Sequence, residues 1–163
     1  MFKFLIVFLC LLSSNIVSAE ITKNYNEFDN TKSIYSISNE ADVRFPKLFI
    51  FRKNISPVGT SFFITIQNNN NVTKLFNSTE DIKLKINDNS LFTLPTRTTK
   101  LGYDKKQATA VLTPEIASQI LSSEKIILQI PIILKQTSIL GSYYYIEVPK
   151  SILDEWKQVI NME

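Results

Sequence analysis

Short runs of β-branched and aromatic residues, separated by turn-forming residues, fill the chain from residue 45 onward. The segments LFIFRKN (48–54) and TSFFITIQN (60–68) flank a stretch that contains Pro57 and Gly59, which predicts a β-hairpin. In DIKLKIND (81–88) apolar residues alternate with lysines, which predicts a strand with one buried face and one face in water. Because the connections have hairpin length, we expect antiparallel pairing.

Further strands are predicted over residues 72–76, 90–95, 107–112, 125–134 and 142–148, with a turn at 87–89. The segment KIILQIPIIL (125–134) is apolar enough to be strongly buried. Proline cannot donate a hydrogen bond to a neighbouring strand, so Pro131 is expected at a sheet edge or a bulge.

Two helices are predicted among these strands. Thr113, Pro114 and Glu115 form a typical helix start and predict a helix over about 114–122. A second helix is predicted over about 150–160. The expected fold class is a single α+β domain with about seven or eight strands, mainly an antiparallel sheet or sandwich, with helices covering one side. A pure β-sandwich with two helical additions is the alternative.

The N-terminus has the pattern of a secretory signal peptide. Lys3 precedes an apolar run at residues 4–12, and small residues before Ala19 predict cleavage between Ala19 and Glu20. The run is shorter than the roughly 20 apolar residues that span a bilayer. We therefore expect an exported, periplasmic protein; an extracellular location or an uncleaved membrane anchor is the alternative.

The predicted organisation has three parts: a signal peptide at 1–19, a polar N-terminal segment at 20–42 and a β-rich exported domain at 43–163. The polar segment is expected to dock at the periphery through a few aromatic residues, with room for one short helix. Asn, Asp, Thr and Ser are frequent in this segment and form helices poorly.

Residue types missing from the chain restrict its chemistry. Histidine is absent, and the only cysteine, Cys10, lies in the predicted signal peptide. The exported domain therefore cannot form a disulfide scaffold, a Cys/His zinc site or a Ser-His-Asp triad. We expect no cofactor and no metal. The formal charge of +3 falls to +2 when Lys3 is removed, which does not favour nucleic acid as a partner.

One basic cluster is the best candidate site. The segment TRTTKLGYDKK (96–106) is predicted to be a long polar loop that could bind an anionic glycan, a lipid headgroup or an acidic protein. Its candidate binding residues are Arg97, Lys100, Tyr103, Lys105 and Lys106.

Other features suggest weaker alternatives. The adjacent carboxylates at 80–81 and 154–155 could supply the acidic pair that glycoside hydrolysis requires, although charged element ends explain them more simply. Tyrosines at 143–145 must alternate across a strand, so at least one hydroxyl is expected to face outward. Asn54, Asn71 and Asn77 fit the N-glycosylation pattern, which matters only in a eukaryotic source.

Three functions follow from this sequence. The first is an exported, non-catalytic binding or envelope-associated protein that recognises an envelope or extracellular protein or glycan. The second is a carboxylate-dependent enzyme acting on glycans, which requires two close acidic side chains in a cleft. The third is a carrier of a small apolar ligand, which requires a strongly curved sheet and a pocket of several hundred Å³ lined by the strand at 125–134.

Overall fold

We describe the protein from a computed structural model. The structure describes residues 21–39, 48–69, 74–101, 105–134 and 142–163. The predicted signal peptide with its cleavage site at Ala19 and Glu20 lies outside these residues, and so does Tyr103.

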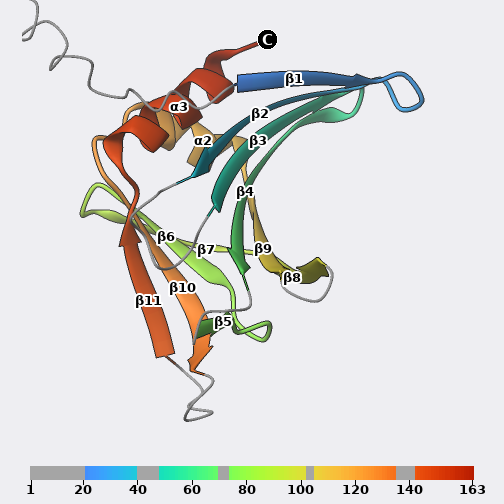
Figure 1. Ribbon diagram of the computed structural model, residues 1–163. Coiled ribbons are helices and arrows are strands. Elements are labelled where there is room, and N and C mark those ends of the chain that lie inside the picture. Colours follow the sequence, from blue (N-terminus) through green and yellow to red (C-terminus); the bar gives the residue numbers. More distant parts are fainter. Residues whose placement is uncertain (1–20, 40–47, 70–73, 102–104, 135–141) are drawn as a thin grey trace, which may run out of the picture.

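Six antiparallel strands form the first sheet (Figure 1). Their order in space is β1 (Ile21–Asn26), β2 (Thr31–Asn39), β3 (Leu48–Ser56), β4 (Gly59–Asn69), β9 (Lys105–Leu112) and β8 (Thr96–Leu101). Figure 1 shows this sheet strongly bent, with the two helices on its convex side. We call it the curved sheet.

The β3–β4 hairpin at its centre matches the sequence prediction. Ser56 pairs with Gly59, so Pro57 and Val58 form a two-residue turn. Gly59 has a φ of 137°, a conformation that residues with a Cβ rarely adopt. The turn chemistry thus sets the register that places every side chain of the hairpin on its face.

The N-terminal segment is wrongly predicted by the sequence. Instead of a peripheral segment with one short helix, residues 21–26 and 31–39 are strands β1 and β2 of the curved sheet. Ile34 of β2 is fully buried in the core. The strand pairing therefore begins at Ile21, well before residue 43.

The second sheet contains five strands: β11 (Ser142–Glu147), β10 (Ile126–Leu134), β6 (Ile82–Ile86) and β7 (Ser90–Leu94), with β5 (Lys74–Phe76) also paired to β10. Strand β6 alternates buried isoleucine and leucine with half-buried lysine, as its sequence predicts. The turn to β7 is made by residues 87–89, where Asn87 has a φ of 44°.

Pro131 does not lie on an edge strand, so the edge, the first of the two predicted positions, is wrong. Strand β10 pairs with β11 on one side and with both β6 and β5 on the other. Pro131 faces the gap between the pairing of β6, which ends at Gln129, and that of β5, which begins at Ile132. Its carbonyl accepts a 2.9 Å hydrogen bond from the Asn77 N–H there. The missing proline N–H therefore costs no bond between strands.

The helices are α2 (Pro114–Leu121) and α3 (Lys150–Asn161), close to their predicted positions. Thr113 caps α2, since its Oγ1 accepts a 3.4 Å bond from the Ile116 N–H. Helix α3 lies on β2 and β3. Its Trp156 is fully buried and stacks on Phe51 with ring centroids 5.2 Å apart.

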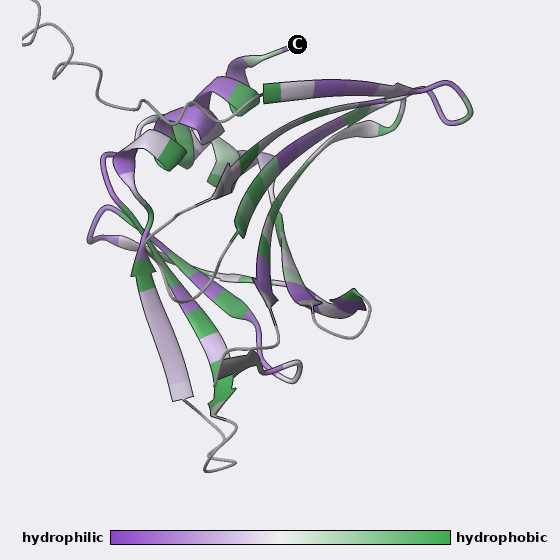
Figure 2. Cartoon of the chain, viewed as in Figure 1, coloured by the Kyte–Doolittle hydropathy of each residue, from purple (hydrophilic) through white to green (hydrophobic). Residues whose placement is uncertain are grey.

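One continuous core joins the convex face of the curved sheet, the second sheet and both helices. Along the strands apolar residues alternate with polar ones, as expected for sheets with one buried face (Figure 2). The predicted α+β class, mainly antiparallel with one mid-chain and one C-terminal helix, is confirmed. The described residues contain more strands than the seven or eight expected, because β1, β2 and β8 were not predicted.

Replacing Trp156 with alanine should lower the free energy of unfolding by about 3–5 kcal/mol, because the loss of a buried aromatic ring leaves a cavity. Urea denaturation followed by circular dichroism measures this change. Gln158→Ala, at an exposed position of the same helix, should change stability by no more than about 0.5 kcal/mol. Similar losses for the two variants would contradict the central role of Trp156.

Candidate binding cavity on the concave face

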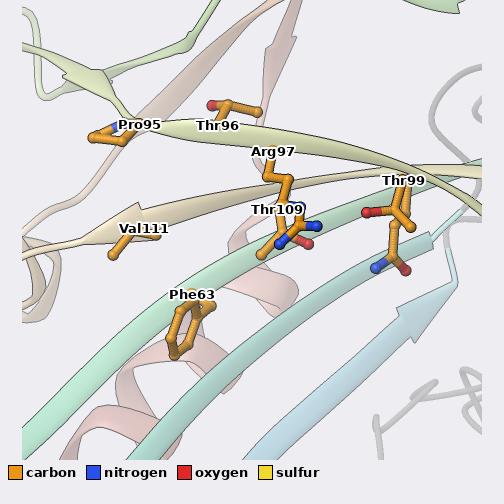
Figure 3. A pocket seen from close by; sticks show the side chains of 8 residues that line it. Phe63, Pro95, Thr96, Arg97, Thr99, Thr109 and Val111 are labelled. Carbon is orange, nitrogen blue, oxygen red and sulfur yellow. The ribbon is translucent and has the colours of Figure 1, made fainter. Parts of the chain in front are cut away.

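A cavity of about 620 Å³ lies on the concave face of the curved sheet (Figure 3). It is formed by β4, β8, β9 and the residues before β8, on the side opposite the helices. The cavity is open to solvent, and its volume falls in the range of small-molecule sites. Its lining residues are Phe63, Pro95, Thr96, Arg97, Thr99, Gln107, Thr109 and Val111.

Strand register brings most of these side chains together. Phe63 of β4 pairs with Val111 of β9. On the other side of β9, Thr109 pairs with Arg97 of β8, and Gln107 pairs with Thr99. Arg97 and Thr99 of β8, and Gln107, Thr109 and Val111 of β9, are two positions apart along their strands, so they share a face. Thr96 lies at the start of β8, and its hydroxyl bonds to the backbone of Ile82 and Leu94. The neighbours of these residues, such as Ala108 and Ala110, point into the core on the convex side.

The cavity has an apolar end and a polar end. Figure 3 shows Pro95, Val111 and Phe63 grouped at one end. The Arg97 side chain extends over Thr109, and Thr99 lies beyond it. Val111 remains 43% exposed, although it belongs to β9, which pairs with β4 on one side and β8 on the other. The arrangement can therefore bury an apolar group and bind a polar group next to it.

A second guanidinium lies beside the apolar end. Arg52 of β3 pairs with Phe63, and its guanidinium carbon is 4.7 Å from the centre of the Phe63 ring. This is a cation–π contact. Deeper on the same face, the hydroxyls of Thr65 and Thr109 lie 3.0 Å apart and bond to each other. The hydroxyls and the ring on the concave face thus have neighbouring partners, and the face carries two positive charges, Arg52 and Arg97.

The charged residues in the strands of the curved sheet are all basic. No Asp or Glu occurs in any of its six strands. Two ion pairs join side chains in and next to the strands of the second sheet, Lys85–Asp88 at 3.2 Å and Lys125–Glu147 at 3.1 Å. The basic residues of the curved sheet are Lys23, Lys32, Arg52, Lys53, Arg97, Lys100, Lys105 and Lys106.

The predicted basic loop is a β-hairpin, so this part of the sequence prediction is wrong. Arg97 and Lys100 belong to β8, while Lys105 and Lys106 belong to β9. Lys100 pairs directly with Lys106, three positions along β8 from the pair formed by Arg97 and Thr109. An odd number of positions along a strand reverses the face. Arg97 therefore faces the cavity, whereas Lys100 faces the opposite side.

Most of the cavity was not predicted from the sequence. Phe63, Thr109 and Val111 lie on segments that the sequence predicts as strands, but their neighbours in the chain are equally apolar or small. The strand at 125–134, which was expected to line a ligand pocket, instead packs in the core with Ile126, Leu128 and Ile130 fully buried. Among the residues whose side chains the structure describes, only Arg97 belongs both to the predicted site and to the cavity.

The adjacent carboxylates have structural partners. Glu80 accepts hydrogen bonds from the Asn77 amide at 2.8 Å and from the Tyr143 hydroxyl at 2.6 Å. Asp81 accepts from the backbone N–H of Thr96 at 2.8 Å. Both residues thus anchor loops of the second sheet.

The second pair of adjacent carboxylates, Asp154 and Glu155, lies on helix α3. Glu155 of α3 accepts a hydrogen bond from the Ser38 hydroxyl, which links the helix to β2. Asp154 is exposed to solvent. Neither this pair nor the pair at 80–81 lines the cavity.

The three tyrosines of β11 alternate as expected. Tyr143 and Tyr145 are exposed, and Tyr144 packs against the core. The hydrogen bond to Glu80 and the negative charge of that carboxylate raise the pKa of Tyr143 above its ordinary value of 10.0.

Two of the three glycosylation patterns lie in the described part of the chain. Asn77 is buried, and its amide bonds to Glu80, so it is not presented to a modifying enzyme. Asn54 lies within β3 and accepts a 2.9 Å bond from the Ser33 hydroxyl. Asn71 lies outside the described residues.

Among the described residues, the cavity lining offers one positive charge, the hydroxyls of Thr99 and Thr109 and the amide of Gln107, but no carboxylate. These groups can donate hydrogen bonds to a ligand. Among the described residues no group of three or more potential metal ligands is found.

Comparisons with protein-family models, curated proteins and solved structures give no match for this chain. Within the described residues, none of the helices has the length and apolar character needed to cross a membrane. The class of the protein is therefore defined by its own geometry, as a two-sheet α+β domain with a cavity on an exposed sheet face.

Replacing Glu80 with glutamine should lower the pKa of Tyr143 toward its ordinary value, because the charged acceptor is removed. In the native protein the raised pKa favours folding below the unfolded pKa, and this contribution is lost as pH rises through the folded pKa. A ¹³C NMR titration of the tyrosine ring carbons measures the shift, with Tyr143→Phe to assign the signal. Tyr145→Phe is the control, and an unchanged Tyr143 titration in Glu80→Gln would contradict the contact.

Proposed function

We propose that this protein is an exported, non-catalytic binding protein of the cell envelope, located in the periplasm, and that its ligand binds in the cavity on the concave face. The observation that carries the proposal is the cavity of about 620 Å³, whose lining has an apolar end and a polar end. Apolar side chains with a few well-placed polar groups are the usual composition of a ligand site. The export part of the proposal rests on the N-terminal sequence at 1–19.

A binding role fits the cavity better than hydrolysis does. Glycoside hydrolysis needs two carboxylates that flank one bond. The lining has none, and Glu80, Asp81 and Glu155 already accept hydrogen bonds that hold the fold together. Carriage of a small apolar ligand is the closest alternative, because it uses the same curved sheet and the apolar end of the same cavity.

Nile red, an uncharged dye that fluoresces in apolar sites, should bind the purified protein. Val111→Trp should reduce this binding strongly, because a larger ring fills the cavity from a half-exposed position that can accept it. Leu91→Trp is the matched control, since Leu91 is an exposed apolar residue of β7 on the other sheet. Equal dye binding by both variants would place the dye elsewhere and would overturn the proposed site.

Export is tested separately by the intact mass of the protein recovered from fractionated cells. We expect a soluble periplasmic species that begins at Glu20. A full-length species in the membrane fraction would overturn the predicted cleavage and favour an uncleaved anchor, and recovery from the medium would favour an extracellular location.

A further inference from the structure

We propose that the natural ligand of the cavity is a small amphiphilic carboxylate, an alkyl chain that ends in a single carboxylate group. This inference rests on the proposed function, because it names the ligand class of the same cavity. The carboxylate binds Arg97, and the alkyl chain lies against Val111, Phe63 and Pro95.

The head of such a ligand fits the polar end. Arg97 is an exposed residue on the edge strand β8 and points over the sheet toward Thr109 (Figure 3). A guanidinium binds a carboxylate through two parallel N–H···O bonds. The hydroxyls of Thr99 and Thr109 and the amide of Gln107 can donate further bonds to the same oxygens.

The tail fits the apolar end. Val111 and Phe63 form a cross-strand pair, and the backbone N–H of Val111 donates a 3.0 Å bond to the carbonyl of Pro95. Three apolar side chains are thereby fixed on one patch, next to the polar end. Covering this patch with an alkyl chain removes apolar surface from water.

The charge of the surroundings selects an anion. No strand of the curved sheet contains an acidic residue, and among the described residues no carboxylate forms an ion pair with Arg97 or Arg52. Arg52 lies over Phe63 and adds a second positive charge beside the tail end. A cationic amphiphile would meet repulsion at both ends of the cavity.

The lining also favours a carboxylate over a phosphate. Among the described lining residues Arg97 has the single guanidinium, which presents one planar pair of N–H donors. A single fork matches a planar, singly charged carboxylate, whereas a doubly charged phosphate group is usually bound by several charged or backbone donors.

Isothermal titration calorimetry with decanoate tests the proposal on the purified protein. Decanoate should bind, whereas decyltrimethylammonium, with the same tail and the opposite charge, and acetate, with the same head and no tail, should bind far more weakly. Decyl phosphate is titrated as a competing head group and should bind more weakly than decanoate.

Arg97→Gln should weaken decanoate binding about tenfold, the loss expected for one hydrogen-bonded charge. The same change should weaken Nile red binding much less, because the dye carries no charge. Lys100→Gln is the matched control: it removes one positive charge from the same strand, but from the other face. Equal losses of decanoate binding in both variants would reveal a general charge effect and overturn the proposal.

The outcomes separate this inference from the proposed function. If Nile red binds and Val111→Trp blocks it, but decanoate binds no better than decyltrimethylammonium, the cavity is a binding site and the carboxylate is wrong. Stronger binding of decyl phosphate than of decanoate would overturn the choice of head group. If neither Nile red nor decanoate binds in a manner sensitive to Val111→Trp, both proposals fail.

Discussion

The stacking of Trp156 on Phe51 holds the convex face of the curved sheet against helix α3, and the rest of the structure depends on this contact. Side chains alternate along a strand, so once Phe51 and its neighbours face the helix, the intervening residues must face the concave side. Arg52 and Phe63 therefore lie on the concave face, where both are half-buried, as a direct consequence of what the core buries. A shift of one residue in register would exchange the core and the cavity.

The two faces of the curved sheet treat their positive charges differently. On the convex side, the Lys53 ammonium donates to the carbonyls of Ile160 and Met162 at 2.8 and 2.6 Å, which satisfies the end of α3 and complements its dipole. Burial lowers the pKa of Lys53, and the negative charge of Glu163 opposes this effect. Here the lysines complete the fold. On the concave side the arginines have no such structural role among the described residues, which leaves them able to bind a ligand.

The sequence predicted those elements whose local signals agree with their environment. The β3–β4 hairpin has a proline and a glycine at its turn, and α2 has Thr113 as its cap. Strands β1 and β2 were missed because they are rich in Asn, Ser and Thr and lack the usual alternation: Ser36 and Ser38 are buried, whereas Ile37 is exposed. Their place is set by the pairing of β2 with β3 and of β1 with β2. Pro131 misled the prediction for a related reason. The local rule excludes proline from central strands, but the break between β6 and β5 is a tertiary feature that no local pattern contains.

The cavity was harder to predict than the fold, because its residues are far apart in the sequence and individually ordinary. Phe63, Val111 and Arg97 lie on three different strands, and only the pairing of β4 with β9 and of β9 with β8 makes them neighbours. The charge of the segment at 96–106 drew attention to the strand that carries Arg97, a lining residue of the cavity. It could not indicate the face, because reading that segment as a loop removes the alternation that separates Arg97 from Lys100. Recognising a strand in this polar segment is therefore the step that separates Arg97, which faces the cavity, from the other basic residues of the cluster.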